Sequence, residues 1–414
     1  MNFSATMPPG ALKHVQVLDL SRVLAGPWAG QTLGDLGAEV IKVERPGVGD
    51  DTRAWGPPFL TDPQGQPTGE SAYYLCANRN KRSITIDFTR PEGQALVRAL
   101  AVKSDVLIEN FKTGGLAAYG LDYESLSALN PRLVYCSITG FGQTGPYAHR
   151  AGYDFLIQGM GGLMSITGQP NGAPGGGPVK VGVALTDILT GLYAATAILA
   201  ALQAREHTGR GQHIDLALLD VQVACLANQS MNYFYGGQSP SRMGNAHPNM
   251  VPYQDFPTAD GYMILAIGND GQFARFCGVA GRPEWASDAR FATNAARLAN
   301  RDHLIPMLRE LTLQRSTGEW IDLLEQHAVP CGPINRVADV FADKQVRARG
   351  MQISMEHPSA GDIPLVASPM RLSETPVQYR AAPPQLGQHT FEVLQAKLDL
   401  SHQTIEELAQ QGVL

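Results

Sequence analysis

The sequence has few cysteines and spaces them without a recognisable pattern. Its five cysteines stand at positions 76, 136, 225, 277 and 331 and never form a C-x-x-C pair, so neither a disulfide framework nor a cysteine zinc site is indicated. The ten histidines likewise form no H-x-x-x-H or H-E-x-x-H pair, which leaves no metal signature. We therefore expect buried thiols and no metal centre.

Charge and long apolar runs are also scarce. Charged residues make up 17% of the chain, its formal net charge is -6, and like charges form no run, so bulk attraction to nucleic acid or to an anionic membrane is not expected. Residues 1–14 lack the pattern of an export signal, and no apolar run approaches the roughly 20 residues of a membrane helix. We expect a cytoplasmic protein without a nucleic-acid or membrane partner.

The first third of the chain alternates strand-like and helix-like segments. The unit formed by residues 15–20, 27–37 and 38–44 is strand, helix, strand, with a connection short enough to make the strands parallel. Further strands are expected at 83–88, 105–111 and 132–141, and a helix at 91–103. Apolar runs such as 106–108 fit strands covered on both faces. This pattern predicts an α/β fold with an open, doubly wound, Rossmann-like parallel sheet.

The character of the chain changes in its second half. A helix is expected at 188–206, a strand at 213–216 and a long helix at 220–234. The segment 236–255 is then rich in Gly, Pro, Asn and Ser, and a hairpin at 261–267 and a largely helical stretch follow it. We therefore expect a large domain at 1–212, a linker at 213–235, a smaller α+β domain at 236–328, and a C-terminal segment, 329–414, that returns to the large domain.

Asp187 stands where the strand-like alternation of residues 179–185 gives way to the apolar helical segment. A carboxylate at a helix N-terminus is stabilised as an anion by the helix dipole and by free N–H groups. Nearby glycines, at 175–177, 182 and 191, would let a large acyl group approach the backbone. The alternative is an ordinary helix N-cap, because Asp is a preferred capping residue.

The first strand–helix–strand unit contains glycines at positions 26, 30 and 34. This spacing differs from the G-x-G-x-x-G of dinucleotide-binding proteins. Arg45, directly after the second strand, offers a guanidinium fork for a phosphate, which suits the ribose phosphate of coenzyme A (CoA) better than NAD. The alternative is that Arg45 is a solvated charge and that the glycines only allow close helix packing.

The whole chain resembles the class III CoA-transferases, the group of formyl-CoA transferase and carnitine CoA-transferase. The resemblance rests on the runs VLDLSRVLAGP (17–27) and GAEVIKVERPG (37–47), and on NKRS, ENF, NPRL, GFG, TGRGQ, PCGP and LGQHT, which follow in that order. It implies CoA thioesters as substrates without a permanently bound cofactor, and an interlocked homodimer. It also places the catalytic aspartate on Asp187, and CoA contacts on Val23, Ala25, Arg45, Asn110 and Phe111.

A carboxylate suits this chemistry because CoA transfer must preserve the activation of the thioester. Attack by Asp187 on an acyl-CoA gives a mixed anhydride, whereas a Ser or Lys would give an ester or amide too stable to return the acyl group. The stretch 244–254 resembles members that use succinyl-CoA and a short dicarboxylate such as glutarate, hydroxymethylglutarate, itaconate or mesaconate. We expect residues 244–249 to act as a lid where formyl-CoA transferases carry a polyglycine loop, which this chain lacks. The alternative is that they form a plain turn of the small domain. Candidates for binding the acceptor acid are Arg53, His247, Asn249 and Gln254. The alternative for each is an ordinary surface or turn residue.

Three other functions remain open. An α-methylacyl-CoA racemase of the same fold would have His where this chain has Tyr153, and a tyrosine is a far weaker base near neutral pH. An NAD-dependent dehydrogenase is disfavoured by the glycine spacing and by Arg45. A non-catalytic CoA-binding module is disfavoured by Asp187.

Overall fold

The computed structural model describes residues 9–414, so the first eight residues of the N-terminal stretch considered above lie outside it. The chain divides into two compact units. The larger unit takes in the described residues up to 163 together with Val181–Asn228 and Gln345–Leu414, and the smaller unit takes in Met164–Lys180 and Gln229–Lys344. The domain limits expected at 212, 235 and 328 remain predictions.

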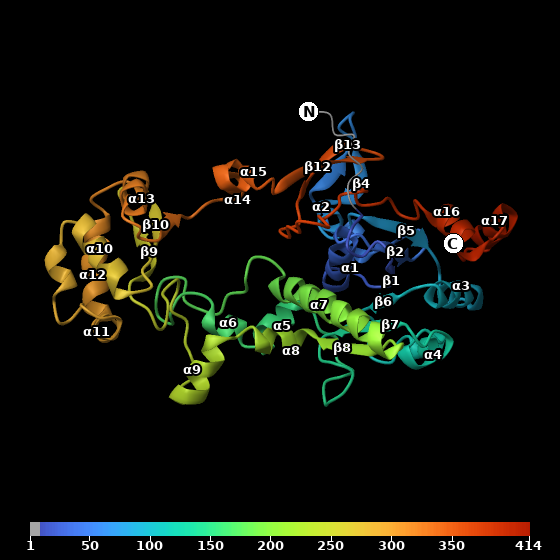
Figure 1. Ribbon diagram of the computed structural model, residues 1–414, viewed down its shortest axis with the longest axis horizontal. Coiled ribbons are helices and arrows are strands. Elements are labelled where there is room, and N and C mark those ends of the chain that lie inside the picture. The colour runs from blue at the N-terminus through green and yellow to red at the C-terminus, as the bar shows by residue number, and fades with distance from the viewer. Residues whose placement is uncertain (1–8) are drawn as a thin grey trace. The chain divides into compact units, whose positions relative to one another are not determined.

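The larger unit is built on a six-stranded sheet in which every neighbouring pair of strands is parallel (Figure 1). The predicted α/β class and parallel sheet are confirmed. The strands, in spatial order, are β5 (Lys81–Thr85), β2 (Glu39–Glu44), β1 (Gln16–Asp19), β6 (Val106–Glu109), β7 (Val134–Thr139) and β8 (His213–Ala217). Because the chain order reverses between β1 and β6, the loops after these two strands diverge and leave a crevice at their carboxyl ends.

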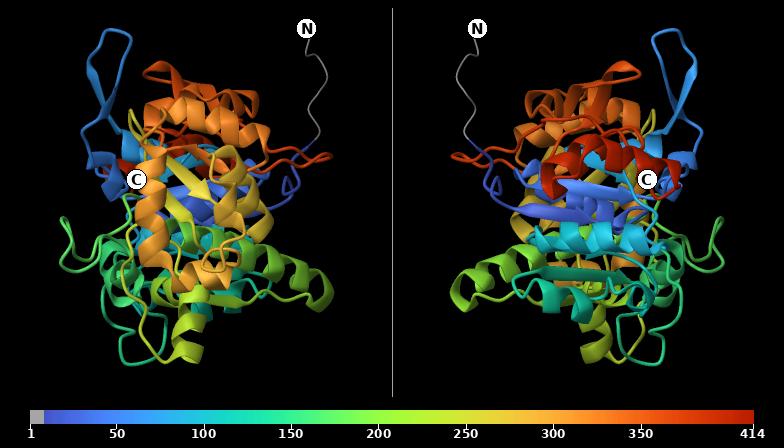
Figure 2. Two further views of the ribbon diagram at one scale, coloured as in Figure 1. Left: turned by 90° about the vertical axis from the view of Figure 1, so that its left-hand side faces the viewer. Right: turned by 90° about the vertical axis from the view of Figure 1, so that its right-hand side faces the viewer.

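Alternate residues along the strands pack into two separate hydrophobic cores, one on each face of the sheet. Val17 packs with helices α1 (Ala25–Asp35) and α7 (Leu185–Thr208), whereas its neighbour Leu18 packs with α3 (Pro91–Val102), α4 (Tyr123–Leu129) and α16 (Thr390–Leu398). Figure 2 shows α16 beside the sheet together with the last helix, α17 (His402–Gln410). Burial on both faces explains the consecutive apolar residues of central strands such as β6, which reads VLIE.

Helix α7 differs from its prediction at its start. It begins at Leu185, so residues 179–184 form no strand, and Asp187 is the third residue of the first turn. The expectation that no apolar segment approaches membrane-spanning length was also wrong. By length and composition alone, α7 is long and apolar enough to cross a membrane. Half of its most apolar 18-residue window is buried within the protein, as in the core helix of a globular fold.

The helix expected at 220–234 is in fact two helices. Helix α8 (Leu218–Ala224) and helix α9 (Asn228–Gly236) are separated at Ala227, whose φ of 47° lies in the left-handed region and cannot continue an α-helix. The apolar periodicity runs through this break, so the sequence pattern does not reveal it.

The smaller unit is an α+β arrangement. Its antiparallel sheet contains β9 (Tyr253–Pro257), β10 (Tyr262–Ala266) and β11 (Cys331–Pro333). A hairpin is present but begins earlier than expected, because β9 and β10 are its two strands and residues 261–267 supply only the second. Four helices share its core: α10 (Asp270–Val279), α11 (Asn294–Ala299), α12 (Arg301–Thr312) and α13 (Thr317–Gln326). Ser316 and Glu319 form a capping box at the start of α13, which satisfies two backbone donors.

Candidate active site

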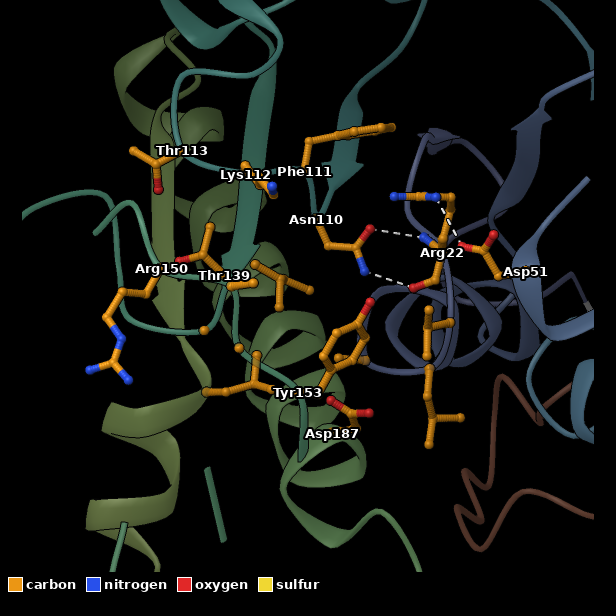
Figure 3. Close-up of a pocket in the computed structure, with 18 of the residues that line it drawn as sticks. Arg22, Asp51, Asn110, Phe111, Lys112, Thr113, Thr139, Arg150, Tyr153 and Asp187 are labelled. Carbon is orange, nitrogen blue, oxygen red and sulfur yellow. Dashed lines mark hydrogen bonds and ion pairs between the residues drawn. The ribbon is translucent and has the colours of Figure 1, made fainter. Parts of the chain in front are cut away.

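A cavity of about 170 Å³ opens in the larger unit at the carboxyl ends of β1, β6 and β7. Its walls come from the loops that follow these strands, from the segment before α5 (Asp154–Met160), and from the first turn of α7. Figure 3 shows Asp187 and Tyr153 at one side of this cavity and Arg22, Asn110 and Phe111 at another. The sequence-predicted residues Asp187, Val23, Ala25, Asn110 and Phe111 therefore line one cavity.

The Asp187 carboxyl is the most perturbed acid of this cavity. Its residue is 9% exposed, and burial raises the pKa of this carboxyl to about 7, with the negative charge of Asp154 adding to the shift. The cap of α7 is Ala184, and no side chain caps the helix from that position. Asp187 is therefore not an N-cap, which removes the alternative considered from the sequence.

Asp154 occupies the helix terminus that was expected to stabilise Asp187. Its carboxylate accepts the backbone N–H of Thr186 at 2.8 Å and that of Asp187 at 3.4 Å, and the side chain of Gln158 donates to it at 2.6 Å. The sequence predicted that the start of α7 stabilises the Asp187 anion, which would lower its pKa. This prediction was wrong, because the free N–H groups there donate to Asp154 instead. A half-ionised, poorly solvated carboxylate near pH 7 is a stronger nucleophile than an ordinary aspartate.

Asn110 and Phe111 reach the cavity in different ways. The Asn110 side chain accepts the Arg22 N–H at 2.9 Å and donates to the Arg22 carbonyl at 2.7 Å (Figure 3), so its amide holds the loop after β1. Phe111 is half-buried, packs edge-on against Phe88, and lies under the Arg22 guanidinium.

Arg45 lies at a second cavity of about 390 Å³, which shares Arg22, Asp51, Phe111 and Lys112 with the first. Arg45 and Lys112 are exposed there, and among residues 9–414 neither side chain has an acidic partner. Arg22 is paired with Asp51 at 2.9 Å. The two cavities together offer an extended ligand a route that begins at the Asp187 carboxylate and passes two unpaired cations.

The glycines of α1 serve packing. A Cβ atom at Gly30 would lie 2.8 Å from an oxygen of the buried Asp19, and one at Gly34 would lie 3.1 Å from the Cβ of Asn80. Asp19 itself forms an ion pair with Lys81 at 2.9 Å, with both side chains fully buried. The four-residue glycine spacing therefore lets α1 lie close over this ion pair, as the packing alternative proposed.

Arg53 is not available to a substrate in this structure. It lies among Glu44, Glu70 and Tyr74, donates to both carboxylates, and lines neither cavity. Its hydrogen-bonding capacity is used inside the fold, so its expected contact with the acceptor acid has no support here.

The other acceptor candidates belong to the smaller unit. The ring of His247 accepts the Asn249 N–H at 3.0 Å, and burial together with Arg301 lowers the pKa of this histidine. Asn249 also accepts from Asn232, and Gln254 is buried in β9. Gly244 donates its N–H to Gly168. Their roles toward the acceptor, and a lid role for residues 244–249, remain predictions.

Sequence reasoning missed the two carboxylates that shape the site, Asp154 and Asp50. The Gly-Tyr-Asp triplet 152–154 was read only for the absence of a histidine. Asp50 precedes Asp51 and Thr52 in a pattern typical of an Asx turn, and its side chain does accept from Thr52. Among residues 9–414 no group of three or more His, Cys, Asp or Glu side chains is arranged to hold a metal ion.

The chain matches known proteins over nearly its whole length. It is 54% identical over 397 residues to a succinate–glutarate CoA-transferase of Agrobacterium fabrum, covering 96% of this chain and 97% of the relative. It is 46% identical over 403 residues to a human succinyl-CoA:glutarate CoA-transferase, covering 97% and 90%. A crystal structure of a CAIB/BAIF family protein from Brucella suis superposes with a TM-score of 0.83 at 53% identity, covering 94% of this chain and all of that one.

The model of CoA-transferase family III matches residues 12–390, a span that includes both cavities and Asp187. The similarity inferred from the short motifs is thereby confirmed. The chain belongs to CoA-transferase family III and is a CoA-transferase that uses CoA thioesters as substrates.

Proposed function

We propose that this protein transfers CoA from succinyl-CoA to a short dicarboxylic acid, glutarate foremost, with Asp187 as the nucleophile. The observation that carries the proposal is a buried carboxyl of pKa about 7 that lines the cavity at the carboxyl ends of the central strands. The names of the similar Agrobacterium and human enzymes support the donor and the acceptor.

In the proposed reaction an oxygen of the Asp187 carboxylate attacks the thioester carbonyl carbon of succinyl-CoA. The carbon–sulfur bond breaks, the thiolate of CoA leaves, and a mixed anhydride joins the succinyl group to Asp187. The thiolate then attacks the aspartyl carbonyl, which releases succinate and leaves CoA on Asp187 as a thioester. Attack by the acceptor carboxylate displaces the thiolate and forms a second anhydride, from which the thiolate takes the new acyl group.

The elongated CoA molecule is proposed to follow the two cavities. Arg45 would hold the phosphate on the adenosine ribose, and Val23 and Ala25 would flank the adenine. Phe111 lines both cavities, so it would contact CoA between its two ends, while Asn110 would act by holding the loop that carries Val23. The strand order supports a doubly wound, Rossmann-like sheet, in which ligands bind where the strand order reverses.

An interlocked homodimer is part of the proposal. Each unit leaves large apolar side chains exposed: Phe155 and Tyr193 in the larger unit, and Phe234 and Tyr235 in the smaller unit, where Tyr235 is 89% exposed. Such groups usually mark a surface that a partner covers. A sedimentation experiment that finds only monomers at micromolar concentration would contradict this part.

A substrate panel tests the function. The protein is incubated with succinyl-CoA and glutarate, hydroxymethylglutarate, itaconate or mesaconate, and new thioesters are weighed by mass spectrometry. Valerate, which has the chain length of glutarate with one carboxylate fewer, is the matched control. We expect glutaryl-CoA to form fastest and valeryl-CoA to be negligible. Absence of any exchange would sink the proposal, and uptake of deuterium at the α-carbon of a branched acyl-CoA would instead favour a racemase.

A further inference from the structure

The loop that connects β1 to α1 contains a strained residue that lines the first cavity, next to Arg22, which lines both cavities. Val23 has a φ of 72°, a left-handed conformation that is rare for a β-branched side chain and costs on the order of 1–3 kcal/mol. Glycine occupies this region without that cost. Residues 22–25 line the first cavity, so the conformation of Val23 sets the shape of its wall.

Asp50 meets this strained residue directly. Its carboxylate accepts the Val23 N–H, at 3.2 and 3.3 Å to the two oxygens, and also accepts from the backbone and hydroxyl of Thr52 at 3.0 and 2.8 Å. Lys42 forms an ion pair with Asp50 at 2.9 Å and donates to the Ser21 carbonyl at 2.7 Å, and both charged side chains are fully buried.

The loop is therefore held at Val23 and at the two residues that precede it. Lys42 holds Ser21, Asp50 holds Val23 itself, and Asn110 holds both backbone groups of Arg22 between them. A buried, fully hydrogen-bonded ion pair often adds little net stability compared with apolar packing, but it fixes one geometry because its partners have no alternative. Such an arrangement is what keeping a β-branched residue at positive φ requires.

We propose that Asp50, supported by Lys42, is a positioning residue for acyl-CoA binding, which acts by holding Val23 in its left-handed conformation. The proposal rests on the CoA binding of the proposed function. The charged pair touches no reacting atom in this account; it determines where the backbone of residues 22–25 faces the ligand. Its loss is expected to weaken acyl-CoA binding much more than it slows the chemical step.

A double-mutant cycle with glycine tests this role. In an otherwise unchanged protein, Asp50→Asn should raise the KM for succinyl-CoA about tenfold. The energy needed to hold Val23 at positive φ would then be drawn from binding, and that energy corresponds to about a factor of ten in the binding constant. The kcat should change by less than about threefold. In a Val23→Gly background the same substitution should raise KM by only about twofold, since glycine needs no restraint at this φ. In a Val23→Ala background, which also removes the valine methyl groups but keeps a Cβ atom, most of the effect of Asp50→Asn should remain.

The outcomes separate positioning from simple support of the fold. Equal effects of Asp50→Asn on KM in the unchanged, alanine and glycine backgrounds would overturn the proposal, as would an effect confined to kcat or to the melting temperature. If Asp50→Asn does not give folded protein, the cycle is run with Asn110→Ala, which frees Arg22, and the same rescue by Val23→Gly is expected. If the protein without substitutions exchanges no CoA, the proposed function fails. If that protein is active but the effects of substituting Asp50 and Val23 on KM are independent of each other, only the positioning role fails.

Discussion

Asp50 and Asp187 are two buried carboxylates of the same unit with opposite electrostatics. Burial by itself raises the pKa of both. At Asp50 the charge of Lys42 and the hydrogen bonds from Thr52 outweigh burial and lower the pKa to about 2. At Asp187 no cation offsets burial, the neighbouring Asp154 adds to it, and the pKa rises to about 7. The comparison shows that pairing, and not depth, separates a structural carboxylate from a reactive one.

The largest expected difference is in activity. Asp187→Ala should lower CoA exchange by about a thousandfold or more, because the mixed anhydride cannot form without the carboxylate. The matched control is Asp220→Asn, which alters an exposed carboxylate in the first turn of α8 and should leave the rate within about twofold. Turnover by Asp187→Ala at a tenth of the normal rate would mean that the nucleophile is misassigned.

Stability should change in opposite directions at the two sites. The raised pKa of Asp187 means that the fold loses stability as pH rises from about 4 to about 7, so Asp187→Asn at pH 8 should gain up to about 4 kcal/mol. The lowered pKa of Asp50 means that its ionised form stabilises the fold above about pH 4, so Asp50→Asn should lose about 3–5 kcal/mol. Urea unfolding at pH 8 measures both. A loss of stability in both variants would contradict the opposite effects expected for Asp187 and Asp50.

The pH dependence of the reaction should report Asp187. With the ionised form required, kcat/KM should rise with pH through about 7 and then level off. Asp154→Asn keeps an acceptor for the Thr186 N–H but removes the adjacent negative charge, so the midpoint should move down by about one unit. A midpoint that stays in place would show that burial alone sets the pKa.

The smallest effect is expected at the exposed end of the proposed route. Arg45→Gln should raise the KM for succinyl-CoA by about tenfold through loss of a charge-assisted contact with phosphate. For succinyl-CoA that lacks the phosphate on the adenosine ribose, Arg45→Gln should leave the KM unchanged. Equal losses with both thioesters would place Arg45 at another part of CoA.

The sequence predicted the elements that follow from local chemistry. Of the seven candidate site residues in the larger unit, five line the first cavity, Arg45 lines the adjoining cavity and Arg53 lines neither. The strand–helix–strand unit, the parallel pairing, the capping box at Ser316 and those five residues follow from periodicity, turn chemistry or short motifs. These features depend on residues close together in sequence.

What the sequence could not predict depends on residues far apart along the chain. Asp154 comes to the start of α7 from 33 positions away. Burial, with the charge of Asp154 adding to it, raises the pKa of Asp187, whereas the sequence predicted a stabilised anion. Arg53 was expected at the substrate because the acceptor's second carboxylate would need a cation, but Arg53 forms buried ion pairs with Glu44 and Glu70. The break at Ala227 leaves the apolar periodicity intact, so only the backbone conformation discloses it.

The most direct test of the account follows oxygen into Asp187 during turnover. Glutarate labelled with oxygen-18 in both carboxylates is incubated with succinyl-CoA and the protein, and the tryptic peptide 181–205 is then weighed. Asp187 is the only acidic side chain in that peptide, so the signal has one source. The account predicts that the peptide gains one oxygen-18 atom in the first turnover and approaches two as turnover continues, because each cycle releases one Asp187 oxygen with succinate and takes one from glutarate. A peptide of ordinary mass, recovered while glutaryl-CoA accumulates, would contradict it.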